Sequence, residues 1–114
     1  MHEAAVAQSI FDTVMAEAQK QKAKPIRAKI TCGTFEAVNE EILAFAFSAI
    51  AKDTIAKDMK IDVETKPVTA LCHQCKKEFS FNIAGPNCIH CGSDSYEILP
   101  DPPLILEQIV FETD

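Results

Sequence analysis

Four of the five cysteines stand in two pairs whose members are separated by two residues, Cys72 with Cys75 and Cys88 with Cys91. That spacing lets both thiolates of a pair reach one ion from a tight turn, and Gly92 suits the left-handed backbone that such a turn tends to need. Two pairs supply four soft sulfur ligands, which favour tetrahedral zinc. The second pair argues against thioredoxin-like redox chemistry, for which a single C-x-x-C motif suffices. The pattern therefore predicts one structural zinc ion.

Other chemistry has to be weighed for the same cysteines. Two disulfides would need an oxidising compartment, which we do not expect for this chain. Iron in a rubredoxin-like site would use the same soft ligands, and neither ligand softness nor geometry excludes it. His73 and His90 lie inside the two motifs, but four thiolates already complete the shell. We therefore expect both imidazoles to face solvent or to donate to sulfur. A closed shell leaves no position for water, which excludes zinc-catalysed hydrolysis.

The amino terminus carries a second set of metal ligands. The α-amine of Met1, the backbone nitrogen of His2 and the imidazole of His2 can close adjacent chelate rings around one ion. Nitrogen ligands in a tetragonal arrangement suit Ni(II) or Cu(II). The first N–H groups of a helix have no intrahelical partner, so deprotonating one of them for a metal breaks no helix bond. A terminal histidine is usually inert, so spacing alone leaves this site a hypothesis.

The charge balance excludes several classes of partner. The chain has a formal net charge of −6, whereas nonspecific nucleic-acid binding and adsorption to an anionic membrane both need a basic surface. Residues 68–100 carry two lysines against three acidic residues, so this region lacks the basic face of a DNA-binding finger. Residues 1–10 do not resemble a secretory signal, and the longest apolar run, 42–51, is too short to span a bilayer. We expect a cytoplasmic protein that binds neither nucleic acid nor membrane.

Hydrophobic periodicity predicts the elements that position these ligands. From residue 4 to about residue 21 apolar residues recur at helical spacing, and Pro25 ends that helix. A second helix is expected from residue 40 to about residue 57, with Asn39 as its cap. Alternating or strand-like composition predicts three strands, at residues 26–32, 61–66 and 104–111.

The last predicted strand belongs beside the first two, so the cysteine region is an excursion from a small α/β domain. We expect an α+β fold in which two helices pack on a small three-stranded mixed sheet, with an inserted four-cysteine zinc-ribbon module. The α/β domain would comprise residues 1–67 plus 101–114, and the zinc-binding module residues 68–100.

Four features occur together in the chain, namely Met1-His2-Glu3 opening an amphipathic helix, Ile30-Thr31-Cys32-Gly33 ending a strand, Leu43-Ala44-Phe45-Ala46-Phe47 in the second helix, and the paired C-x-x-C motifs. Together they resemble the HypA/HybF family of hydrogenase maturation nickel chaperones. The resemblance covers essentially the whole chain. The family strand usually ends in Ile-Gly, whereas here Cys32 precedes Gly33, and we interpret Cys32 as a small buried apolar residue. Some relatives have an acidic residue near the loop position of Asn39, which as an amide is a weaker nickel ligand, and Glu40 is its neighbour.

The resemblance implies a function. His2 would be a nickel ligand, with neighbouring backbone nitrogens completing the site, and the four paired cysteines would hold structural Zn(II). The protein would carry Ni(II) as transient cargo to the precursor of a [NiFe]-hydrogenase large subunit, working with a nickel-binding GTPase of the same maturation pathway. Some similar proteins also serve urease.

Two other functions compete with the nickel chaperone. A zinc-stabilised protein–protein adaptor would have the same cysteine module and no labile metal. An electron carrier would hold iron in the four-cysteine site. A hydrolase or transferase finds little support, because the chain has no phosphate loop and no convincing pair of nucleophile and base. We therefore do not expect an enzyme.

Overall fold

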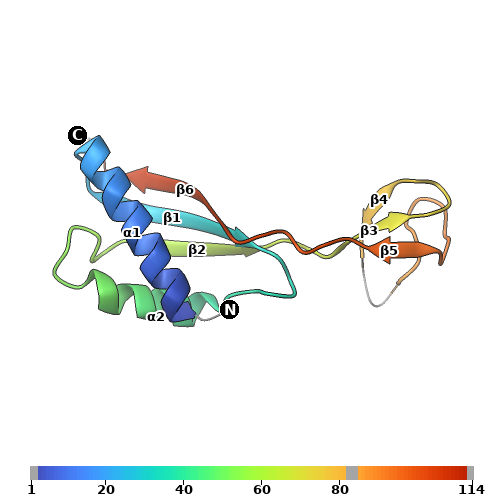
Figure 1. Cartoon of the computed structure of the whole chain (residues 1–114), viewed down its shortest axis with the longest axis horizontal. Coiled ribbons are helices and arrows are strands. Elements are labelled where there is room, and N and C mark those ends of the chain that lie inside the picture. Colours follow the sequence, from blue (N-terminus) through green and yellow to red (C-terminus); the bar gives the residue numbers. More distant parts are fainter. Residues whose placement is uncertain (1–2, 82–84, 113–114) are drawn as a thin grey trace.

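The computed structural model describes residues 3–81 and 85–112. Met1 and His2 lie outside the described residues. The chain forms two lobes joined by two extended segments, and its extents are 55 × 27 × 18 Å (Figure 1). Its radius of gyration is 18.2 Å, whereas a compact domain of this length has about 13 Å. The two lobes therefore do not share one core.

Two helices belong to the larger lobe, α1 (Glu3–Gln21) and α2 (Glu40–Ala51). Asn39 caps α2 as expected, because its side chain accepts a hydrogen bond from the backbone N–H of Ile42 at 2.9 Å. The second helix is shorter than the prediction, which extended it to about residue 57. It ends early because Asp53 adopts a left-handed backbone (φ 65°) and the Thr54 hydroxyl donates to the Ala51 carbonyl. Those local bonds replace the next helical turn.

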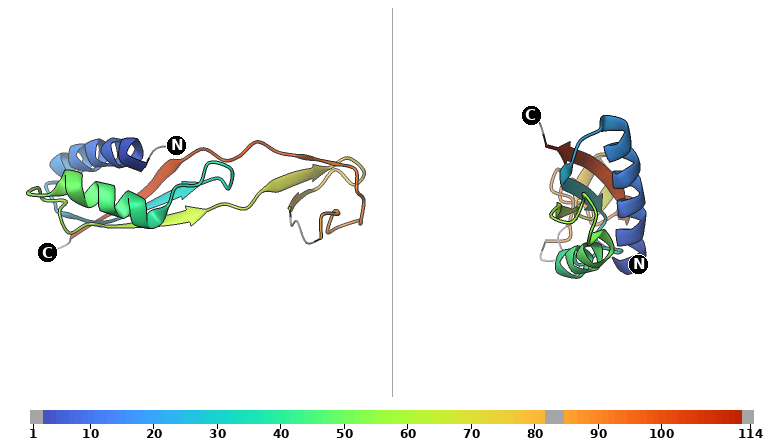
Figure 2. Two further views of the ribbon diagram at one scale, coloured as in Figure 1. Left: turned by 90° about the horizontal axis from the view of Figure 1, so that it is seen from below. Right: turned by 90° about the vertical axis from the view of Figure 1, so that its left-hand side faces the viewer.

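The sheet of this lobe has three strands in the order β2-β1-β6, namely β1 (Pro25–Cys32), β2 (Lys60–Thr65) and β6 (Ile105–Phe111). β1 pairs in parallel with β2 and antiparallel with β6, so the sheet is mixed, and the last strand returns beside the first as predicted. Both helices lie on one face of the sheet (Figures 1 and 2). Alternate residues of β1 point into the core between helices and sheet. The fully buried members of that core include Ile30, Val14, Leu43 and Phe47.

The other face of this sheet carries ion pairs between neighbouring strands. Arg27 of β1 lies 3.4 Å from Asp62 of β2, and Lys29 lies 3.4 Å from Glu64 and 3.6 Å from Glu107. Lys66 approaches Glu64 to 2.8 Å, and these contacts with Lys66 and Lys29 lower the pKa of Glu64. Such exposed pairs add little stability. They keep this face of the sheet polar and help to fix its register.

The smaller lobe has a second three-stranded sheet, in the order β4-β3-β5. Its strands are β3 (Thr69–Cys72), β4 (Glu78–Ser80) and β5 (Tyr96–Ile98), and both pairings are antiparallel. The core is small, because the buried apolar side chains besides cysteine among the described residues of this lobe are Ala70 and Phe79. Tyr96 packs edge-on against Phe79 with ring centroids 5.5 Å apart. So little buried area does not hold a module of this size together without further cross-links.

A carboxylate ties the extended segments to the larger lobe. Asp101 accepts hydrogen bonds through Oδ2 from the backbone N–H groups of Phe35 and Glu36, at 3.0 and 3.2 Å. Gly33 makes room for it, since a Cβ on Gly33 would overlap the Asp101 carboxylate. The Thr34 hydroxyl donates to the carbonyl of Lys66 at 2.7 Å, which fixes the other extended segment to the same loop.

The predicted α+β fold is confirmed in its main features, namely two helices on a mixed three-stranded sheet with an inserted four-cysteine module. Within the described ranges 3–81 and 85–112, neither helix combines the length and the apolar character that a membrane span requires.

Candidate metal centre

The two cysteine pairs lie in two turns of similar design. Cys72 ends β3, and the turn that follows closes with a hydrogen bond from Lys76 N–H to the Cys72 carbonyl at 3.1 Å. In the second turn the N–H of Gly92 donates to the Cys88 carbonyl at 2.8 Å. In each turn the residue after the second cysteine is left-handed, with φ of 62° at Lys76 and 77° at Gly92. The sequence predicted the glycine, but a lysine gave no signal that its backbone adopts the same conformation.

The four sulfur atoms converge on one point. All lie within 4.8 Å of one another, and the distances are 3.6 Å from Cys72 to Cys91 and 3.7 Å from Cys75 to Cys88. A tetrahedral ion with metal–sulfur bonds of about 2.3 Å places its sulfurs about 3.8 Å apart. A disulfide would bring two sulfurs to about 2.05 Å, and all four cysteines are free thiols. The four cysteines therefore fit one tetrahedral metal ion, and they form no disulfides in this structure.

Backbone N–H groups prepare two of the thiols for ionisation. Hydrogen bonds from the backbone N–H of Cys75 and Gln74 lower the pKa of Cys72 to about 6, although burial opposes them. Burial also opposes ionisation at Cys88, yet the N–H groups of His90 and Cys91 bring the pKa of this thiol below its usual range. The Cys75 nitrogen lies 3.5 Å from the Cys72 sulfur, and the His90 nitrogen lies 3.4 Å from the Cys88 sulfur. Such bonds favour the thiolate, which is the form that binds metal.

Cys91 is harder to ionise than the other thiols discussed above, as long as no cation is bound. The Ser93 N–H favours its thiolate, but burial and the neighbouring thiols raise the pKa of Cys91 to about 11. Once Cys72 is ionised, a second or third negative charge within the cluster is costly. A divalent cation removes that cost, and the loaded site then carries a net charge of about −2.

The two histidines inside the motifs point to partners other than the sulfur cluster. His73 Nδ1 lies 3.4 Å from the Ser95 hydroxyl and its Nε2 lies 3.7 Å from the Glu97 carboxylate. His90 Nε2 lies 3.2 Å from the carbonyl oxygen of Glu78, to which it donates. Neither imidazole belongs to the group of converging ligand atoms. The group that could hold a metal ion consists of the four cysteines.

The predicted nickel ligand His2 lies outside the described residues, but Glu3, which follows it, is bonded to the loop before α2. Glu3 opens α1, and its Oε2 accepts a hydrogen bond from the backbone N–H of Asn39 at 3.0 Å. The start of α1 is thereby bonded to the residue that caps α2. This contact between positions 36 residues apart was not predicted, because nothing in a local pattern indicates which loop a terminal carboxylate will meet.

Two other residues considered for nickel have structural roles. Asn39 uses its side chain to cap α2, and the Glu40 carboxylate accepts from the backbone N–H of Val63 at 3.4 Å. Cys32 is buried in the core of the larger lobe, where 1% of it is exposed, as the interpretation of a small apolar residue requires. It is not part of the sulfur cluster.

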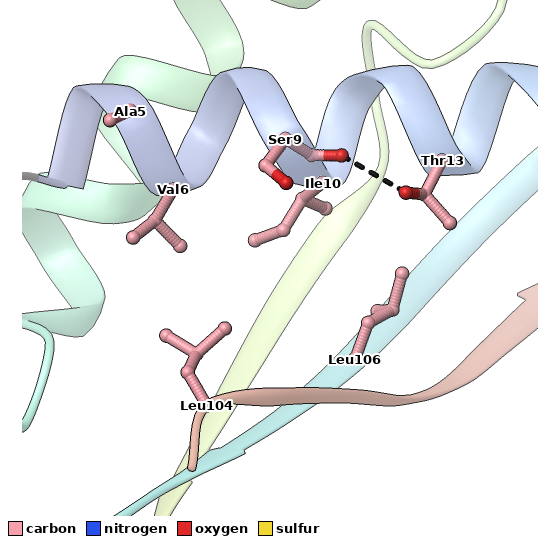
Figure 3. Close-up of a pocket in the computed structure, with 7 residues that line it drawn as sticks. All are labelled: Ala5, Val6, Ser9, Ile10, Thr13, Leu104 and Leu106. Carbon is pink, nitrogen blue, oxygen red and sulfur yellow. Dashed lines mark hydrogen bonds between the residues drawn. The ribbon is translucent and has the colours of Figure 1, made fainter.

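An apolar groove of about 460 Å³ runs between α1 and β6 (Figure 3). Its polar groups are the hydroxyls of Ser9 and Thr13, and Thr13 donates its proton to the Ser9 carbonyl at 3.1 Å. The groove contains none of the predicted metal ligands and no ionisable side chain. It is lined by Ala5, Val6, Ser9, Ile10, Thr13, Leu104 and Leu106.

Comparison with known families, like the cysteine geometry, indicates a metal-binding protein. Residues 1–111 match the model of the HypA family, described as hydrogenase/urease nickel incorporation metallochaperones. The chain belongs to the HypA family. Its relatives are therefore maturation factors and not enzymes, and the expectation that this chain is not an enzyme is confirmed.

Individual family members match over nearly their whole length. The hydrogenase maturation factor HypA of Chlorobium phaeobacteroides is 33% identical, with 98% of this chain and 100% of the relative covered. HypA of Synechococcus elongatus is 31% identical over 96% of this chain and 97% of the relative. Among solved structures, the nickel metallochaperone HypA from Helicobacter pylori matches over 100% of both chains with a TM-score of 0.62 and 23% identity. A second HypA solution structure gives 0.70, also at 23% identity, so these two likenesses establish the fold.

Proposed function

We propose that this chain binds Ni(II) at its amino terminus and delivers it during maturation of [NiFe]-hydrogenase, with urease as a further possible client. His2 would supply the imidazole, and the α-amine of Met1 and neighbouring backbone nitrogen would complete a chelate that suits Ni(II). The observation that carries the proposal is the bond from Asn39 N–H to Glu3, which fixes the residue after His2 at the start of α2. The anchored Glu3 directly follows the proposed ligand His2 in the sequence, which supports assigning the nickel site to the larger lobe.

The four-cysteine cluster would hold structural Zn(II) and take no part in carrying nickel. Its shell would be closed, so an incoming ion would find no open position there. In the described residues no other His, Cys, Asp and Glu side chains gather closely enough to form a second such cluster. This separation gives each lobe its own metal, with residues 1–67 plus 101–114 as the nickel-binding domain and residues 68–100 as the zinc-binding module.

The partners follow from the proposed cargo. A chaperone that holds nickel through a few nitrogen atoms would receive or pass the ion by direct docking to a nickel-binding maturation GTPase and to the hydrogenase large-subunit precursor. Both are expected in the cytoplasm. The acidic charge of −6 gives no support to nucleic acid or membrane as an alternative partner.

Adding one equivalent of Ni(II) to zinc-loaded protein tests whether the two metal sites are separate. We expect the absorption spectrum of nickel bound by nitrogen, with the zinc content unchanged by elemental analysis. Intense thiolate-to-nickel charge transfer, or loss of zinc as nickel is added, would show that the cysteines are the nickel ligands and would overturn this assignment. Iron in the purified protein would favour the electron-carrier alternative.

A further inference from the structure

The four sulfur ligands of the candidate metal centre are not equally protected from solvent. Cys72 and Cys88 are buried, with 0% and 3% of their surface exposed, and Cys75 is half-buried, whereas Cys91 is exposed. Cys91 ends the second cysteine pair, in a turn that lies outside the three strands of the smaller lobe. A dissolved reagent that approaches the cluster therefore meets Cys91 before the other three cysteines.

The reagent to which such a cluster is most sensitive is a small oxidant. Cysteines bind a metal as thiolates, so in the loaded site all four sulfurs carry the reactive form. Oxidation by a peroxide depends on thiolate character and on exposure. Because thiolate character is then common to the four ligands, exposure decides which of them reacts first, and exposure favours Cys91.

A second cysteine lies where it can complete the reaction. The Cys72 sulfur is 3.6 Å from the Cys91 sulfur, and a disulfide needs these two atoms to approach to about 2.05 Å. Burial shields Cys72 from the reagent but not from its neighbour. Cys75 and Cys88 form another close pair, with sulfurs 3.7 Å apart, but neither of them is exposed. The first disulfide should therefore join Cys72 to Cys91.

We propose that Cys91 is a peroxide-sensitive modification site and that Cys72 is its resolving cysteine. The Cys91 thiolate attacks one oxygen of hydrogen peroxide, so that an S–O bond forms, the O–O bond breaks, and hydroxide leaves and takes up a proton from solvent to give water. The Cys72 thiolate then attacks the Cys91 sulfur, so that the S–S bond forms, the S–O bond breaks, and a second hydroxide leaves as water. One peroxide is reduced to two waters, and two thiolates are oxidised to one disulfide.

This oxidation removes two of the four metal ligands and with them the support of the smaller lobe. Cys75 and Cys88 alone provide half of a tetrahedral shell. Among the described residues of this lobe, two other apolar side chains are buried, so its folding depends on the metal. The larger lobe has its own core, to which none of the four paired cysteines belongs, and it stays folded. The modification therefore acts as a switch on one lobe.

The switch is reversible, because it ends in a disulfide and not in a higher oxide of sulfur. A disulfide formed in a reducing compartment is transient, and a thiol reductant together with zinc should restore the loaded site. The inference rests on the proposed zinc assignment and is independent of the proposed nickel site.

Peroxide titration of full-length, zinc-loaded protein tests the proposal, once elemental analysis has established the zinc content. A colorimetric chelator follows zinc release, and mass spectrometry of unreduced peptides locates the disulfides. One equivalent of hydrogen peroxide should release the zinc and produce a disulfide between Cys72 and Cys91. Retention of zinc, or a first disulfide between Cys75 and Cys88, would overturn the proposal alone. A chain that binds no zinc would overturn the zinc assignment and this inference with it.

Two matched variants separate the exposure of a ligand from the stability of the site. Cys91→His and Cys88→His each leave three cysteines and one histidine, a ligand set that also holds structural zinc. Cys91→His should slow peroxide-dependent zinc release at least about tenfold, because the remaining thiolates are buried or half-buried. Cys88→His keeps Cys91 next to Cys72 and should release zinc at a rate within about threefold of the wild type.

Equal release rates in the two histidine variants would contradict the assignment of Cys91 as the first site of oxidation. The rate is taken as the difference between samples with and without peroxide, so a weaker zinc affinity common to both variants does not imitate the expected result. The disulfide map of the wild-type protein decides the order of oxidation independently of how either variant folds.

Discussion

The thiols of the cluster differ in how readily they ionise, although they converge on one point. Cys72, which receives backbone N–H groups, has a pKa of about 6, whereas Cys91, which meets the other thiols, has a pKa of about 11. At neutral pH the thiolate of Cys72 is therefore already formed, whereas Cys91 keeps a proton that a metal must displace. Metal binding to such a set releases protons and is weakened by acid.

The affinity for Zn²⁺ should consequently fall as the pH is lowered from 8 to 5. The lowered pKa of Cys72 means that its thiolate is present above about pH 6 and is protonated below it, so the decline should become steeper below that pH. Competition with a zinc chelator of known pH dependence measures this. An affinity that does not change across the range would contradict the ionisation pattern of the four thiols.

A second prediction at residue scale concerns Gly33 and the Asp101 carboxylate. Gly33→Ala places a methyl group where the carboxylate lies, so Asp101 must move away from the N–H groups of Phe35 and Glu36. We expect unfolding of the larger lobe to become easier by roughly 1–3 kcal/mol. Urea denaturation followed by circular dichroism measures the loss. Gly85→Ala is the control, since nothing lies within 4 Å of its Cβ position, and equal losses in both variants would exclude the steric explanation.

At the scale of elements, the two lobes depend on different forces. The larger lobe buries apolar side chains between two helices and a sheet. The smaller lobe has three short strands around its cysteines and, among its described residues, two other buried apolar side chains. Metal ligation in small modules supplies apparent free energies on the order of 10–16 kcal/mol. The ion would thus replace the core that the smaller lobe lacks.

Cys75→Ala should therefore unfold the smaller lobe and leave the larger one folded. We expect loss of bound zinc and collapse of the amide signals of residues 68–100 in a two-dimensional NMR spectrum, with the signals of α1, α2 and β1 preserved. Cys32→Ala is the matched control, because it removes a buried cysteine of the larger lobe. The Cys32→Ala protein should retain one zinc ion. A Cys75→Ala protein that keeps stoichiometric zinc and an unchanged spectrum would refute the structural assignment.

Sequence patterns predicted those features that depend on local spacing. The cysteine pairs, the α2 cap at Asn39 and the strands at either side of the module all appear where they were expected, since each is specified by residues within one turn or one strand. The early end of α2 was missed because apolar residues continue to residue 56, and only the left-handed backbone at Asp53 reveals the break. The contacts of Asp101 with the 33–36 loop and of Glu3 with Asn39 join distant segments, which no local pattern specifies.

At the scale of the whole molecule, a chain of bonds runs from the segments next to the smaller lobe toward the amino terminus. Asp101 and Lys66 bind the loop after β1, that loop leads to Asn39, and the Asn39 N–H donates to Glu3 at the start of α1. The extended shape keeps the cysteine cluster on a separate lobe from α1 (Figure 1). Under the proposed function, two metals would serve one chain without competing for ligands, zinc for folding and nickel for transport.

Isothermal titration of Ni(II) into zinc-loaded protein tests that division most directly. Four proteins would be compared: the native chain with a free α-amine, a chain with one residue added ahead of Met1, His2→Ala, and His73→Ala as the matched histidine control. The added residue turns the amine into an amide, and His2→Ala removes the imidazole, so both should lose most nickel affinity while zinc content and folding stay unchanged. Native and His73→Ala proteins should bind equally, and acid should weaken both as the amine and imidazole take up protons. Equal nickel affinity in all four proteins would contradict the account and leave a zinc-stabilised adaptor in its place.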